Sequence, residues 1–181
     1  MQASSVRGWC GLVVAVGLLV AHTFAEAPTA PKLSSVASAE LLTAAVQEYL
    51  ADLKPLVADE AAYMQNADQV GYKANAVTAL THVLGKHDGA SPYKANAVEI
   101  MAAGRELTRA KDYATAKAAW DKLSAAVAKT DVAATEPTWD RVASLGRMME
   151  ETSAINGKLK RNLRRLDRTH DDNVRNAAVL A

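Results

Sequence analysis

The chain has 181 residues, of which 50% are hydrophobic and 23% charged, and its formal net charge is +1. This apolar fraction and this charge balance exclude a disordered chain, and the length fits one domain. Nucleic acid is not an expected partner, because the sequence carries no strong excess of basic residues. The single cysteine, Cys10, excludes an intramolecular disulfide and a zinc site built from cysteines.

The first 25 residues have the pattern of a signal peptide. Arg7 precedes the apolar run Gly11–Ala21, whose 11 residues are too few to cross a bilayer of about 30 Å as a helix. Small residues before Glu26 predict cleavage after Ala25, and an uncut membrane anchor is the alternative. We therefore expect a secreted or periplasmic chain with no membrane-spanning segment after cleavage.

The remainder divides into a flexible linker rich in Pro, Ser and Ala at 26–37 and a domain at 38–181. This domain is rich in Ala and Leu, which are strong helix formers, and contains no alternating strand pattern. The composition predicts an all-α fold, an up-and-down antiparallel four-helix bundle with short extra helical segments.

The apolar stripe of the first helix keeps its phase across Pro55, which predicts one kinked helix over 38–66. The alternative is a break at Lys54, with Pro55 at the first position of a second helix. Further helices are predicted at 70–86, 92–110, 112–130, 138–166 and 173–181.

The mature sequence contains no motif for nucleophilic catalysis and no paired-histidine metal motif. His82 and His87 are five residues apart, so they diverge around a helix. We expect His82 in solvent. We expect His87 at the C-terminal end of a helix, where its side chain interacts favourably with the helix dipole. The sequence thus predicts no catalytic residue, no metal site and a protein that is not an enzyme.

A basic ridge is predicted near the end of the long helix. Lys158, Arg161, Arg165 and Arg168 follow a spacing of three or four residues, which places them on one face. This ridge would suit an anionic partner, such as an acidic protein or a cell-envelope surface. The alternative is a solvated face whose charge complements the helix dipole.

The stretch Tyr93–Lys129 forms an alanine-rich helical hairpin pattern, with Glu106–Tyr113 ending one helix and Ala114–Leu123 forming the next. Together with the Met-rich segment Met148–Leu159, it resembles the exported four-helix bundles of the cytochrome c′ and cytochrome b562 type. The resemblance implies a non-enzymatic binding or structural module without a cofactor.

The same resemblance implies an alternative, a non-covalent haem-binding electron-transfer protein. Met64 and His87 are then the candidate axial ligands. The sequence departs from the cytochrome c′ pattern, because the mature chain has no cysteine for a CxxCH attachment motif.

Overall fold

The computed structural model describes residues 32–129, 135–163 and 166–181, with side chains in the last range from Thr169 onward. The predicted signal peptide, residues 1–25, lies outside the described residues.

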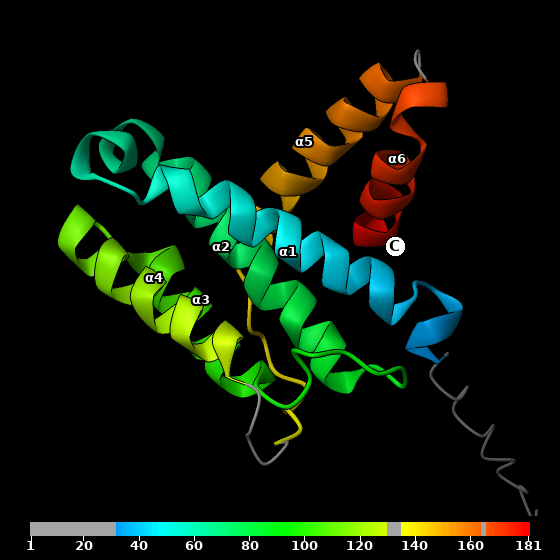
Figure 1. Cartoon of the computed structure of the whole chain (residues 1–181), viewed down its shortest axis with the longest axis horizontal. Coiled ribbons are helices and arrows are strands. Elements are labelled where there is room, and N and C mark those ends of the chain that lie inside the picture. The colour runs from blue at the N-terminus through cyan, green and yellow to red at the C-terminus, as the bar shows by residue number, and fades with distance from the viewer. Residues whose placement is uncertain (1–31, 130–134, 164–165) are drawn as a thin grey trace, which may run out of the picture. The chain divides into compact units, whose positions relative to one another are not determined.

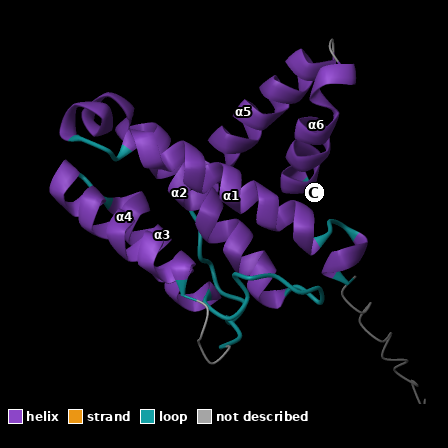
Figure 2. Cartoon of the chain, viewed as in Figure 1, coloured by secondary structure: helices purple, strands orange, loops and turns teal. Residues whose placement is uncertain are grey.

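The described residues form six α-helices and one short 3-10 helix, and no strand (Figures 1 and 2). The all-α prediction is confirmed. The elements are η1 (Leu33–Ser35), α1 (Ala39–Leu56), α2 (Glu60–Lys86), α3 (Ala97–Arg109), α4 (Tyr113–Ala128), α5 (Leu145–Asn162) and α6 (Leu166–Leu180).

The core lies along α2, against which α1, α3 and α5 pack, while α4 packs on α3 and α6 on α1 (Figure 1). Val46, Leu53 and Val77 are fully buried in it, as is Ile100 of α3. Such apolar burial is the main source of folding free energy. At Gly104 the helices α3 and α2 approach so closely that an added Cβ would lie 2.4 Å from Oγ1 of Thr78.

The break after α1 differs from both predicted alternatives. Pro55 lies in the last turn of α1, and the chain turns before Asp59, whose carboxylate accepts a hydrogen bond from the Ala62 N–H at 2.8 Å. This N-cap starts α2, so the prediction of one helix over 38–66 was wrong. Asn66 is a kink within α2, where its amide donates to the Ala62 carbonyl at 2.8 Å.

The third helix begins at Ala97, five residues later than predicted, because the side chain of Asn96 is engaged elsewhere. Its amide donates to the carbonyl of Ala126 at 3.2 Å and to that of Lys129, which ties the start of α3 to the end of α4. Residues 91–96 consequently form turns.

Part of the predicted linker, residues 32–37, is packed against the end of α2. The backbone N–H of Ser34 donates to Asp88 at 2.9 Å, and the pKa of Asp88 falls to about 2 because its carboxylate accepts the hydroxyl and the N–H of Ser34. Residues 32–37 are therefore anchored to the residues that follow α2, while the rest of the predicted linker, residues 26–31, lies outside the described residues.

The C-terminal helix is longer than predicted. α6 begins at Leu166, not at residue 173, and returns to α1, where Nε of Arg175 lies 3.0 Å from a carboxylate oxygen of Glu48. Within the described ranges, no helix is long and apolar enough to cross a membrane.

Candidate functional site

An extended segment, residues 135–144, precedes α5 and is called the strap below. It runs antiparallel to α2. Nε2 of His82 donates to the carbonyl of Thr138 at 2.8 Å, and the ring of Trp139 lies 5.0 Å from that of His82. Close to the end of α2, Lys86 pairs with Glu136 at 2.9 Å. Because the strap takes residues 135–144, α5 starts at Leu145 instead of residue 138.

The expectation that His82 lies in solvent was wrong. Its side chain is buried, because the strap covers the face of α2 that the helical wheel assigned to water. A hydrogen bond to Thr138 satisfies the ring, as buried polar groups require.

Asn75 fixes the end of the strap and the start of α5. The backbone N–H of Ser144 donates to Oδ1 of Asn75 at 2.8 Å, and Nδ2 of Asn75 donates to the Ser144 carbonyl at 3.3 Å. Asn75 is buried, so these bonds form away from bulk water.

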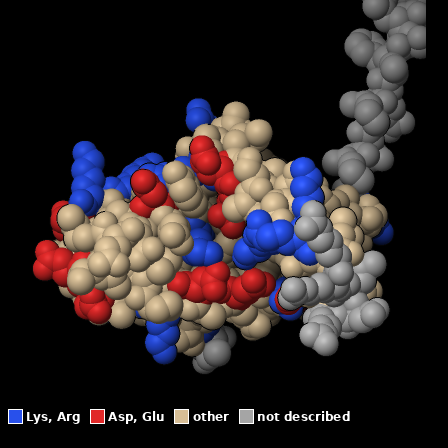
Figure 3. All heavy atoms as spheres, turned by 90° about the horizontal axis from the view of Figure 1, so that it is seen from above, with Lys and Arg blue, Asp and Glu red and all other residues tan. Residues whose placement is uncertain are grey.

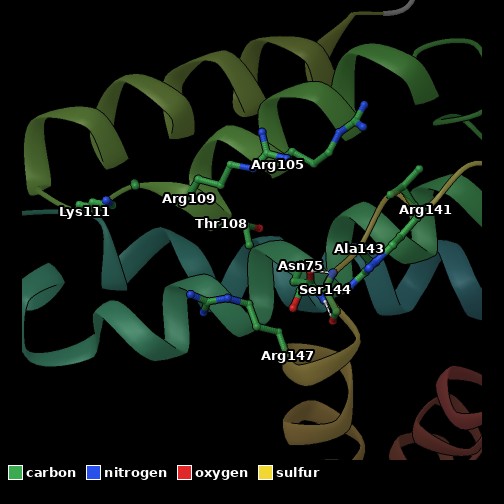
Figure 4. A pocket seen from close by; sticks show the side chains of 11 residues that line it. Asn75, Arg105, Thr108, Arg109, Lys111, Arg141, Ala143, Ser144 and Arg147 are labelled. Atoms are coloured by element: carbon green, nitrogen blue, oxygen red, sulfur yellow. Dashed lines mark hydrogen bonds between the residues drawn. The ribbon is translucent and has the colours of Figure 1, made fainter.

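A cleft of about 730 Å³ lies between α3 on one side and the strap, α2 and the start of α5 on the other (Figure 4). Its uncharged lining includes Asn75, Thr108 and Ser144. No carboxylate lines it among the residues that the structure describes. Five of its lining residues are basic: Arg105, Arg109, Lys111, Arg141 and Arg147.

None of these five side chains forms an ion pair within the described part of the chain. Elsewhere basic and acidic residues are intermixed, as on the face shown in Figure 3, and many of them pair. Lys117 pairs with Asp121, and Lys129 pairs with Glu99. The cleft therefore gathers five cations that form no ion pair with a described carboxylate, and of these Arg109 and Lys111 also line a neighbouring hollow with Glu106 and Asp112.

Arg147 is the most constrained cation of the cleft. Its guanidinium lies 5.4 Å from the ring centre of Tyr72, a cation–π distance. It also fills the space beside Gly71, where an added Cβ would lie 1.9 Å from Nη1. Nη1 is buried and has no hydrogen-bond partner in the described structure. A buried donor without an acceptor is unusual and costs free energy.

The start of α5 adds a partial positive charge to the same wall. Ser144 occupies the N-cap position, but its side chain makes no capping hydrogen bond, and the first turn contains no acidic residue. The free N–H groups and the dipole of this turn favour an anion.

Tyr63 of α2 contacts Ala110, one of the residues that line the cleft. Its hydroxyl donates to the Ala110 carbonyl at 3.0 Å. Burial raises the pKa of Tyr63 and the charge of Asp112 raises it further, while the guanidinium of Arg147 opposes both. The phenol thus stays protonated at neutral pH and holds the corner between α3 and α4.

The structure does not bring Met64 and His87 together. Met64 is 66% exposed near the start of α2, whereas His87 follows its end, about 35 Å away at 1.5 Å per residue. Both ring nitrogens of His87 are occupied. Nε2 donates to the Ala37 carbonyl at 2.9 Å, and Nδ1 accepts the N–H of Gly89 at 2.8 Å. Haem binding by Met64 and His87 stays a prediction that the resemblance implies. The geometry of the two residues does not favour it.

The structure describes the side chains of two of the four predicted ridge residues, Lys158 and Arg161. Arg161 is exposed, but Lys158 is half-buried over α1, in a small crevice that Glu48 and Asp52 also line. The side chains of Arg165 and Arg168 lie outside the described residues. The two ridge residues that can be placed therefore differ in their surroundings.

The cleft arginines were missed because three separate segments contribute them. The available signal was the run Arg105, Arg109 and Lys111, of which the first two are one helical turn apart. Periodicity gives no means of placing Arg141 and Arg147 opposite this run.

Across the described side chains, no group of three or more His, Cys, Asp or Glu residues is placed to hold a metal ion. No family model, no curated protein and no solved structure matches the chain.

Proposed function

We propose that this chain is an exported, non-enzymatic binding protein whose ligand is an anion held in the cleft between α3 and the start of α5. The observation that carries this proposal is the set of five basic side chains that line the cleft without a carboxylate. The first turn of α5, which has free N–H groups and no acidic residue, supports it.

The physical argument is that like charges repel when they share a cleft, and an anion relieves that repulsion. A cleft lined by charges of one sign also concentrates the field and raises the local concentration of the opposite ion. Arginine suits this role, because its planar guanidinium offers two parallel N–H donors to an oxyanion.

The rest of the fold serves as a scaffold in this proposal. The packing of α1 on α2, α2 on α3 and α3 on α4 supports an antiparallel bundle of these four helices. Export rests on the signal-peptide pattern of residues 1–25, so the ligand would be met in the periplasm or outside the cell. An acidic protein or a cell-envelope surface that contacts Arg161 is the alternative partner.

Isothermal titration calorimetry with inorganic tripolyphosphate tests the proposal. The purified protein is compared with a variant in which Arg105, Arg109, Arg141 and Arg147 are all replaced by Gln. We expect saturable binding by the wild type and none by the variant. The control replaces Lys117 and Lys129, which are paired and lie outside the cleft, and should bind as the wild type does.

Binding that survives in the cleft variant, or no binding by the wild type, would refute the proposal. Export is tested separately by the mass of the protein recovered outside the cytoplasm. Cleavage after Ala25 predicts a chain that begins at Glu26.

A further inference from the structure

The cations of the cleft belong to two facing walls. Arg105 and Arg109 project from α3, and Lys111 follows directly after that helix. Arg141 of the strap and Arg147 of α5 lie on the other side, where Figure 4 shows Arg141 extending toward Ser144. Charge is therefore presented to a ligand from two directions.

Each wall is held by its own contacts. Arg105 and Arg109 are four residues apart on one helix, a rise of about 6 Å. The facing wall is fixed by the Asn75–Ser144 hydrogen bonds and by the packing of Arg147 against Tyr72. The walls are thus separate parts, since α3 packs on α2 and α4 whereas α5 packs on α2 and α6.

A single small anion does not match this arrangement. At about 730 Å³ the cleft falls in the size range of sites for small organic molecules, roughly 300–1,000 Å³. An anion bound to one wall would leave the arginines of the other uncompensated. One molecule with several anionic groups can contact both walls, and joining these groups raises the effective concentration of the second contact.

We propose that the ligand of this cleft is a small molecule with two or more oxyanion groups that bridges Arg105 and Arg109 on α3 to Arg141 and Arg147 on the strap and α5. This inference rests on the proposed function and specifies its ligand. Bridging ties the α5–α6 hairpin to α3, so that occupancy of the cleft stabilises the position of the hairpin.

The test compares inorganic tripolyphosphate with orthophosphate by calorimetry, at equal ionic strength because charge interactions are screened by salt. One double variant, R105Q/R109Q, removes the α3 wall. A second, R141Q/R147Q, removes the facing wall. The control K117Q/K129Q changes the net charge by the same amount outside the cleft. Far-UV circular dichroism confirms that each variant is folded.

We expect tripolyphosphate to bind at least about tenfold more tightly than orthophosphate, and either wall variant to lose about tenfold or more of that affinity. The control should change affinity less than about twofold, since exposed charges act weakly at this range. A charge-retaining variant, R141K/R147K, should fall between the wild type and R141Q/R147Q, because lysine lacks the bidentate fork.

Two results would overturn the bridging ligand and leave the proposed function standing. One is equal affinity for the two anions. The other is tripolyphosphate affinity that depends on one wall only. Binding of neither anion to the wild type would overturn both proposals.

Discussion

Asn75 and Ser144 exchange two hydrogen bonds, and this pair joins the middle of α2 to the N-cap residue of α5. The side chain of Asn75 satisfies both the N–H and the carbonyl of Ser144, as a neighbouring strand would. It thereby holds Ser144, the residue before α5, against α2, three residues ahead of Arg147. The geometry of the proposed site thus depends on a residue that carries no charge.

Replacing Asn75 by Ala should weaken both the fold and the cleft. The variant leaves the N–H and the carbonyl of Ser144 without these partners, which should cost about 1–3 kcal/mol in the free energy of unfolding. Tripolyphosphate affinity should fall several-fold, although no charge is removed. Urea unfolding and calorimetry measure the two effects. Asn156→Ala, an exposed change on α5, is the control. Unchanged stability together with unchanged affinity would show that the pair does not position the site.

Gly71→Ala should displace the guanidinium of Arg147, because the new Cβ would occupy the space of Nη1. The expected result is a several-fold loss of tripolyphosphate affinity with normal helix content, since alanine favours a helix interior by about 0.5–1 kcal/mol over glycine. The same change in an R147Q background should have little further effect, and this non-additivity is the measured quantity.

The matched control for this substitution is Gly157→Ala on α5. There an added Cβ would lie 3.4 Å from Nη1 of Arg161, an ordinary contact with the end of a flexible side chain. An equal loss of affinity in both glycine variants would show that displacement of Arg147 is not the cause.

The anchor between Ser34 and Asp88 should depend on pH in the acid range. The pKa of Asp88 is lowered to about 2 in the folded chain, so its contribution is complete above the unfolded value near 4 and is lost as the pH falls toward 2. Asp88→Asn mimics the protonated group. The difference in unfolding midpoint between wild type and this variant should be constant above about pH 5, shrink as the pH falls through about 4, and vanish only below about pH 2. A difference that stays at its full size down to pH 2 would exclude the carboxylate charge as its source.

Hemin titration tests the alternative that the cytochrome resemblance implies. Met64 is exposed and far from His87, whose ring nitrogens are both engaged, so we expect no stoichiometric haem uptake. The visible absorption spectrum is the readout. A saturable Soret band that is lost in His87→Ala would reverse this conclusion and favour the haem alternative.

The helices could be predicted from the sequence because local patterns encode them. Alanine and leucine content predicted the all-α class, and the side chains of Ser38 and Asp112 accept the capping hydrogen bonds at the starts of α1 and α4. The break after α1 has a local cause, the N-cap Asp59, but two other failures have tertiary causes. Asn96 engages the end of α4 and the strap covers His82, and neither contact leaves a periodic signal.

The candidate site was less accessible to prediction than the fold. A helical wheel treats each helix alone, so it favoured Lys158 and Arg161, which lie on one helix, as the basic surface. The cleft instead combines Arg105 with Arg141 and Arg147, whose proximity depends on the Asn75 contact with Ser144. A dispersed basic site of this kind is visible only once the tertiary structure is known.

The most direct test of the central claim follows the arginine side chains by NMR while tripolyphosphate is added to the ¹⁵N-labelled protein. The account predicts that the Nε–Hε resonances of Arg105, Arg109, Arg141 and Arg147 shift together and saturate at the calorimetric affinity, while that of Arg161 does not move. Shifts confined to Arg161, or no shift of any of the four cleft arginines, would contradict it.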